Sequence, residues 1–435
     1  MSSASRRAAL QVLRRLVDAG HTAYLAGGCV RDALLGLEPK DHDVATDAPP
    51  KVVRELWPNS QPVGQAFGVV LCYATVDRKR HAVEVATFRT EGVYSDGRRP
   101  DSVAYTTAEH DAKRRDFTIN GLFADPLNQA DKHEQTGAGT ADTHTCPTTG
   151  DRVIDYVDGL PDLLKHKVIR AIGDPTQRFA EDYLRMLRAV RFAARLNFKL
   201  DPATARAIRD HAPKLNHIAR ERIGDEVKRA LMSARPALAV RLFDELNLTP
   251  AVFGQPITPS EPDALAVLAA LSPNADLATR IAVWTHGRTP PIEPRISRRA
   301  LDLSNPLRDE LLHTAKLRTA LQGFAALGVA GRKRLLSHPR FEQTRLWARV
   351  GGLDPALAKR VDADHETLSN DGIGLAPPPL ITGDDLVGLG LTPGPDFKRW
   401  LDDAYDAQLE GKIATREQAL TRVRPDADTG STGPG

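Results

Sequence analysis

The sequence predicts an α+β fold in which an N-terminal head with a mixed β-sheet is followed by all-α domains. Short Val- and Ala-rich segments with partial alternation, which are typical of strands, lie in the first third of the chain. After Gly173 the pattern changes to helical periodicity with short Pro, Gly and Asn breaks, and it continues to about residue 349. Strands that give way to helices indicate an α+β part followed by a helical remainder.

Each N-terminal element follows from its local pattern. Apolar residues at helical spacing predict helices, alternation predicts strands, and a polar segment with Gly and Pro predicts a mobile loop. In chain order we expect a helix over residues 4–19, a buried strand over 23–26, a helix over 30–35, an acidic strand over 40–46, a β-pair formed by 68–76 and 81–88, and a mobile loop over 90–105.

The chain of 435 residues is long enough for several domains at roughly 100–200 residues each. A polar stretch without periodicity, rich in Thr, Gly, Ala and Asp, predicts a flexible insertion in the head. We expect a head over 1–155 with this insertion at about 127–150, a helical neck over 156–235, a helical body over 236–370, a helical tail over 371–425 and a disordered end over 426–435.

The composition excludes several classes of protein. Lys and Arg number 59 against 56 Asp and Glu, so a globally basic coat is excluded and any contact with nucleic acid must come from local patches. Only 5% of the residues are aromatic, which argues against stacking platforms. Cys29, Cys72 and Cys146 form neither a disulfide framework nor a zinc motif, which predicts a reducing cytoplasm. No signal peptide or membrane span is expected.

Two acidic residues indicate a metal site. Asp41 and Asp43 are two residues apart in a predicted strand, and a period of two places both carboxylates on the same face. Paired carboxylate oxygens suit Mg²⁺, which also takes waters and substrate phosphates as ligands. The plain alternative is a solvated loop or turn.

The surroundings of this pair favour a nucleotide. Gly27 and Gly28 lie between a strand and a helix, where backbone N–H groups can approach phosphates. Arg31 follows one turn later and could reach a triphosphate, and Glu84 in a later strand is a third carboxylate for catalysis at the metal site. Alternatively, the glycine turn serves packing only and binds no phosphate. Glu84 could likewise be a solvent-facing strand residue without a catalytic role.

A charged stripe marks the helix expected over 178–196. At ~100° per residue, six charged side chains share about one third of its circumference. They are Arg178, Glu181, Asp182, Arg185, Arg188 and Arg195. The plain interpretation is a solvated face with ion pairs at i,i+3 and i,i+4 spacing.

Five segments carry a resemblance to a known family. They are LAGGCVRDALLG with KDHDVAT at 25–46, RRDFTING at 114–121, DGLPDL at 158–163, RFAEDYLRMLRAVRFAARL at 178–196 and ERIGDE at 221–226. In this order they resemble the motifs of class II tRNA nucleotidyltransferases and bacterial poly(A) polymerases, whose second motif usually has Ala where Gly121 stands. The ending over 380–420 resembles the C-terminal module of many members. The resemblance implies a catalytic nucleotidyltransferase head and an RNA-binding tail.

The resemblance also implies roles for single residues. In the family, the second motif contacts the sugar and the fourth reads the Watson–Crick edge of the incoming base. The matching residues are Arg115, Asp116 and Asn120 for the ribose, Asp182 and Arg185 for base selection, and Arg188 for the triphosphate. An ionised Asp only accepts hydrogen bonds and an Arg guanidinium only donates them. Together they can match a base edge that carries both donors and acceptors. Alternatively, Asp116 caps a helix that begins near Phe117.

The implied activity is template-independent addition of CMP and AMP, from CTP and ATP, to the 3′ end of tRNA with Mg²⁺. Addition of A alone, poly(A) tailing and a non-catalytic RNA-binding relative stay open, and transfer to a small molecule is a further alternative. A polar loop near 90–105 favours an enzyme that can add A. The oligomeric state is not predicted.

Overall fold

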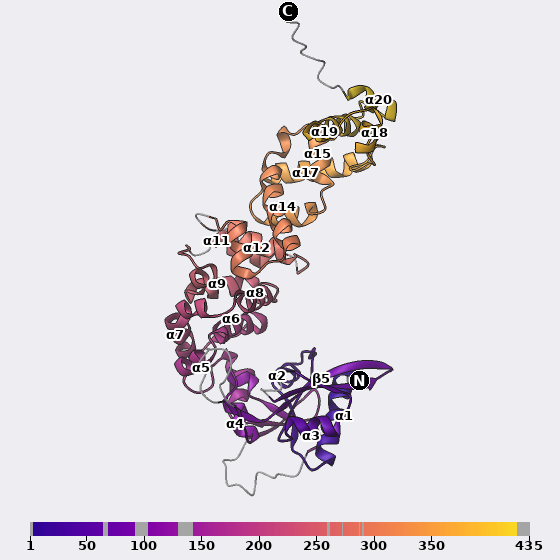
Figure 1. Ribbon diagram of the computed structural model, residues 1–435. Helices are drawn as coiled ribbons and strands as arrows, with labels where there is room; N and C mark the ends of the chain where they lie inside the picture. Colours follow the sequence, from indigo (N-terminus) through magenta and orange to yellow (C-terminus); the bar gives the residue numbers. More distant parts are fainter. Residues whose placement is uncertain are drawn as a thin grey trace, which may run out of the picture. The chain divides into compact units, whose positions relative to one another are not determined.

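A computed structural model describes residues 3–63, 68–91, 103–128, 142–258, 262–271, 273–286, 288 and 291–423. The chain divides into two compact units, Met1–Pro259 with Arg299–Asp302 and Ser260–Arg298 with Leu303–Gly435. The division falls inside the predicted body, and the expected four-domain arrangement stays a prediction. In the part of the chain that is described, no helix is both long and apolar enough to cross a membrane. The α+β class is confirmed, with a mixed sheet in the head and a mostly helical region after it (Figure 1).

The head contains one mixed eight-stranded sheet. Its order is β3-β4-β5-β2-β1-β8-β10-β9, and the β2–β5 pair is parallel while the other pairs are antiparallel. The strands are β1 (Ala23–Ala26), β2 (Asp43–Thr46), β3 (Ser60–Pro62), β4 (Val69–Val76), β5 (Lys79–Thr87), β8 (Phe123–Asp125), β9 (Asp142–Thr145) and β10 (Arg152–Asp155). The predicted strand 23–26 and the predicted β-pair are confirmed.

Local sequence explains the first elements. Helix α1 (Ala4–Asp18) begins after Ser3, whose hydroxyl accepts from the backbone N–H of Arg6, and it buries an apolar face against the sheet. Asp77 and Arg78 both have positive φ, as a two-residue turn between β4 and β5 requires. The predicted helix after the glycine turn is α2 (Gly28–Leu34). The centre of the head core is aromatic, with Tyr24, Phe88 and Phe123 ring centroids about 6 Å apart.

Two stretches expected to be irregular contain strands. The predicted loop over 90–105 begins and ends in a strand pair, β6 (Arg89–Glu91) with β7 (Val103–Tyr105), and its residues 92–102 lie outside the described ones. The predicted insertion at 127–150 contains β9, which pairs with β10 at the edge of the sheet. Its residues 129–141 and the predicted disordered end at 426–435 are outside the description.

The helix expected over 178–196 is two helices. These are α5 (Pro175–Glu181) and α6 (Leu184–Leu196), separated by Asp182 with φ −152° and ψ 104°. The Asp182 carboxylate accepts from the backbone N–H of Leu184 at 3.0 Å, so its side chain stabilises the start of α6 and ends the helical run. The other helices of this unit are α3 (Pro50–Leu56), α4 (Ala108–Lys113), α7 (Pro202–His211), α8 (Arg220–Leu231), α9 (Pro236–Glu245) and α10 (Leu248–Phe253).

The second unit is helical in its described elements. Its helices begin with α11 (Pro262–Ala270) and end with α20 (Arg416–Arg422). One apolar cluster surrounds Phe324 and Phe341, and a second surrounds Leu386 and Ala404. The Gly- and Pro-rich segment between these two clusters begins at Asp371. The Asp371 carboxylate forms an ion pair with Nζ of the fully buried Lys333, at a distance of 2.5 Å.

Candidate active site

One pocket of the first unit brings together all twelve residues that the sequence singles out for the site. They come from the β1–α2 turn, from β2 and β5, from the segment after α4, and from the start of α6. The pocket is lined by Gly27, Gly28, Arg31, Asp41, Asp43, Glu84, Arg115, Asp116, Asn120, Asp182, Arg185 and Arg188, together with Ala26, Val44, Ala45, Ala86, Arg89, Arg114, Leu184, Arg191, Phe192, Arg195, Arg222 and Arg229.

The acidic wall is built by two parallel strands. Val44 pairs with Val85 in the β2–β5 ladder, so Asp43 and Glu84, which precede them, lie side by side. Asp41 lies in the turn before β2 and not in the strand, so the expected strand periodicity does not position it. Burial raises the pKa of Asp43 to about 6, and the nearby Glu84 and Asp41 carboxylates add to the shift.

These three carboxylates make no hydrogen bond or ion pair within the described part of the chain. Among the described residues, no hydrogen bond or ion pair reaches the side chain of Asp41, Asp43 or Glu84, although arginines line the same pocket. In the same residues, no group of three or more His, Cys, Asp or Glu is placed to hold a metal ion. Any metal bound here therefore takes part of its coordination from outside the protein.

The glycine turn is tightly packed. Gly27 has φ +70°, and a Cβ there would lie 2.9 Å from Arg115 Nη1. Its N–H donates to the carbonyl of Leu122 at 3.0 Å, so one of the two backbone donors expected to cradle phosphate is already bonded. Gly28 is the first residue of α2.

Arg31 is not free to meet a triphosphate in this structure. It is 2% exposed, and its Nη1 donates to Asn120 Oδ1 at 2.6 Å. Its Nε and Nη2 both donate to Asp32, and burial lowers the pKa of its guanidinium. Arg31 therefore orients Asn120, a predicted ribose residue.

The segment around Asp116, predicted to contact the ribose, is also held by arginine contacts. Asp116 accepts from the N–H of Phe117 and from Asn120 Nδ2, both at 2.9 Å, and Arg188 donates to its second oxygen at 2.8 Å. Burial alone would raise the pKa of Asp116, but Arg188 and the Asn120 hydrogen bond hold it at about 2. The helix expected near Phe117 is a 3₁₀ turn over Thr118–Asn120, so Asp116 is not an α-helical cap.

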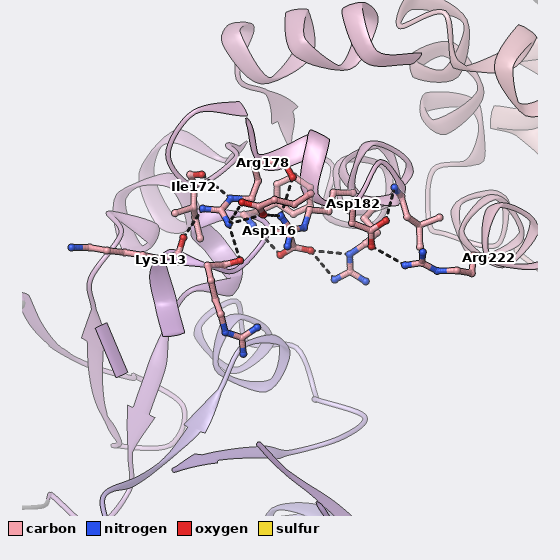
Figure 2. Close-up of polar contacts among 12 residues, drawn as sticks. Lys113, Asp116, Ile172, Arg178, Asp182 and Arg222 are labelled. Carbon is pink, nitrogen blue, oxygen red and sulfur yellow. Dashed lines mark hydrogen bonds and ion pairs between the residues drawn. The ribbon is translucent and has the colours of Figure 1, made fainter. Parts of the chain in front are cut away.

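The two residues predicted for base selection have separate partners, and Figure 2 shows Asp182 facing Arg222. Asp182 Oδ2 accepts from Arg222 at 2.7 Å. Arg185 pairs with Glu181 and donates to the carbonyl of Arg178 at 2.9 Å. Both side chains line the pocket, and each is oriented by a neighbour.

The sequence did not single out several arginines of the pocket. Arg222 and Arg229 lie seven residues apart on one face of α8, within and just after the ERIGDE segment, and their spacing was the available signal. In total, ten arginines and five carboxylates line the pocket. This excess of positive charge suits a polyanionic ligand such as a nucleoside triphosphate.

Comparison with known proteins agrees with this arrangement. The family described as "Poly A polymerase head domain" matches residues 23–170, and "Probable RNA and SrmB- binding site of polymerase A" matches residues 197–259. The chain is 32% identical over 432 residues to a CCA-adding enzyme of Lacticaseibacillus paracasei, covering 96% of this chain and 95% of that one. It is 33% identical to a CCA-adding enzyme of Leuconostoc mesenteroides, with 94% of each chain covered.

Solved structures show the same fold. The Bacillus stearothermophilus CCA-adding enzyme in complex with CTP superposes with a TM-score of 0.74 at 27% identity, over 97% of this chain and 98% of that one. The Thermotoga maritima CCA-adding enzyme complexed with tRNA shares the fold at 18% identity and a TM-score of 0.62. With its nucleotidyltransferase head and its similarity over nearly the full length of these relatives, the chain belongs to the family of CCA-adding enzymes.

Proposed function

We propose that this protein adds C, C and A to the 3′ end of tRNA without a nucleic-acid template, using CTP and ATP. One observation carries the proposal: a single pocket combines the Asp41, Asp43 and Glu84 carboxylates, which no hydrogen bond or ion pair of the described residues occupies, with an arginine-rich wall and with Asp182 and Arg185. Full CCA addition is favoured over addition of A alone or poly(A) tailing because the relatives that match most of the chain are named CCA-adding enzymes.

The donor set fits Mg²⁺. Asp41 and Asp43 would hold the ion, because carboxylate oxygens are hard ligands that suit Mg²⁺ and, among the described residues, no hydrogen bond or ion pair occupies these two. When bound, Mg²⁺ lowers the pKa of the primer 3′-hydroxyl and neutralises charge on the leaving pyrophosphate. Glu84, beside Asp43 in the sheet, adds negative charge that strengthens cation binding.

The remaining residues bind and orient the nucleotide. Arg115, Asp116 and Asn120 face the ribose, where hydrogen bonds to the 2′-hydroxyl distinguish RNA precursors from DNA precursors. Asp182 accepts from the exocyclic amine that cytosine and adenine share, and Arg185 donates to the adjacent acceptor. Positioning and electrostatics supply most of the catalysis in such a transfer.

The arginines of the pocket supply the positive charge that binds the triphosphate. Gly27, Gly28, Arg31 and Arg188 were predicted for this role, but Arg31 and Arg188 are bonded to Asn120 and Asp116. We assign them an indirect role, in which they add positive charge near the phosphates while they orient the ribose contacts.

The body of the tRNA extends beyond the nucleotide pocket, which receives only its 3′ end. Residues 197–259, which match the RNA-binding family, form α7 to α10, of which α8 also supplies Arg222 and Arg229 to the pocket, and they are the first candidate for the tRNA surface. The helical tail over 371–425 stays a second candidate. We also propose a cytoplasmic location, because the substrate is tRNA and Cys29, Cys72 and Cys146 are free thiols.

Three tRNA transcripts test the proposal: one that ends before CCA, one after C and one after CC. Each is incubated with Mg²⁺ and labelled CTP or ATP, and the products are sized at single-nucleotide resolution. Stepwise C, C and A followed by a stop is expected. A alone on the CC-ended transcript would indicate an A-adding enzyme, long A ladders a poly(A) polymerase, and no extension a non-catalytic relative.

A further inference from the structure

Arg178 is the arginine of the charged stripe that does not line the nucleotide pocket. It extends from α5, and its side chain is 14% exposed. Its Nη2 donates to the carbonyl of Lys113 at 2.7 Å, its Nη1 to the carbonyl of Arg114 at 3.0 Å and its Nε to the carbonyl of Ile172 at 3.1 Å. One planar guanidinium therefore joins three backbone positions (Figure 2).

Two of these carbonyls need a partner from elsewhere in the chain. Helix α4 ends at Lys113, and the last carbonyls of a helix have no intrahelical donor. A guanidinium at this end is also favoured by the helix dipole. Arg178 thus fixes the C-terminal end of α4.

The segment that Arg178 fixes continues directly into the ribose residues. Arg115 and Asp116 follow the two bonded carbonyls, and Arg188 of α6 holds the Asp116 carboxylate at 2.7 Å. The segment 113–116 is therefore bonded twice by the helical part of the unit, through its backbone by Arg178 and through its side chain by Arg188. We call this pair of contacts the arginine clamp.

Arg178 also connects to the base-selecting side. Its Nη1 donates to the Glu181 carboxylate at 3.0 Å, and the same carboxylate pairs with Arg185. The carbonyl of Arg178 accepts from Arg185 at 2.9 Å. Arg178 therefore contacts both the segment 113–116 and the Glu181 carboxylate that pairs with Arg185.

We infer that Arg178 is a positioning residue that sets ribose selection, by holding the segment 113–116 at a fixed distance from the incoming sugar. This inference rests on the proposed function. A site built to bond a hydroxyl rejects the analogue that lacks it, because its own polar groups are then left unpaired. That rejection requires fixed groups, so a loosened segment should lose it first.

The test compares CTP with dCTP in wild type, Arg178→Ala, Arg178→Lys and the control Arg220→Ala. Arg220 also donates to a backbone carbonyl, that of Val252 at 2.6 Å, but it does not line the pocket. Lysine keeps the charge but has one nitrogen, so it cannot bond three separate carbonyls. The readout is the ratio of kcat/KM for CTP to that for dCTP, on a transcript that ends before CCA.

Both Arg178 variants are expected to lower this ratio about 10-fold or more, the loss that matches one charged hydrogen bond. Arg220→Ala should keep the wild-type ratio. An unchanged ratio would overturn the inference. If activity with CTP and with dCTP fell by the same factor, Arg178 would have a general structural role. If Arg178→Ala does not fold, Arg178→Lys is judged by the same criteria.

Calorimetric titration separates this inference from the proposed function. If the wild type extends no transcript, the proposed function fails, and the ratio of dissociation constants for dCTP and CTP still tests the clamp without turnover. A ratio that falls in both Arg178 variants supports the inference, and a ratio that stays at the wild-type value overturns it.

Discussion

Replacing Asp116 with Asn should make the stability difference from wild type depend on pH. The pKa of Asp116 is about 2 in the folded chain, against an ordinary value of 3.8. At about 1.4 kcal/mol per pKa unit, the ionised carboxylate favours the folded chain by about 2 kcal/mol at neutral pH. Asn keeps the size and hydrogen-bonding shape of the side chain but lacks the charge that Arg188 pairs.

The direction of this pH dependence follows from the lowered pKa of Asp116 in the folded chain. A carboxylate whose pKa is lowered by folding contributes its full stabilisation above its unfolded pKa, and it loses this as the pH falls through the folded value. The pH-dependent part of the difference should therefore be complete at pH 7 and about 1 kcal/mol smaller at pH 3. For a unit of this size, that corresponds to a gap in Tm that narrows by about 2–4 °C.

Differential scanning calorimetry of wild type and Asp116→Asn between pH 7 and pH 3 measures this gap for the transition of the first unit. A gap that stays constant over this range would refute the reasoning, because the carboxylate would then not be held in its charged form by Arg188. A gap that widens on acidification would show the opposite direction of the pKa shift.

The other predictions concern the site directly. Asp41→Ala and Asp43→Ala should each abolish nucleotide transfer while the circular dichroism spectrum is kept, and turnover in either variant would contradict the metal assignment. Arg185→Ala should relax the choice among nucleotides in a competition assay more than it raises the Mg²⁺ requirement. Gly121→Ala should lower Tm, because its Cβ would lie 2.5 Å from Val157 Cγ2, at a cost of about 1–3 kcal/mol. The double variant with Val157→Ala should recover part of this loss, and no recovery would assign the cost to another contact.

The sequence predicted which residues meet in the pocket but not how they pair. The motifs named Arg31 and Asn120 for different parts of the nucleotide, and the structure bonds them to each other. This contact joins positions 89 residues apart, and no local pattern reports it. Arg222 was missed for the same reason, since its partner Asp182 lies 40 residues earlier in the chain.

The predicted boundaries of helices and strands were wrong where tertiary contacts determine them. Helical periodicity continues through Asp182, but its carboxylate bonds the N–H of Leu184 and ends the helix there. The polar stretch Asp142–Thr145 has no strand pattern of its own and is a strand because β10 supplies the hydrogen bonds. In contrast, β4 and β5 were predictable, because apolar alternation along both strands already describes which faces are buried.

The pairing inside the pocket separates a fixed part of the site from an adjustable one. Asn120 and Asp116 are held by buried or half-buried arginines, so the contacts proposed for the ribose are ordered before a nucleotide arrives, and binding through them would cost little conformational entropy. Arg185 is bonded to Glu181 on the same short stretch of chain, and it must exchange that partner to reach a base. An enzyme that adds C, C and A meets the same ribose at each of three additions but two different base edges. A rigid ribose segment beside an arginine that can exchange partners meets both requirements with one pocket.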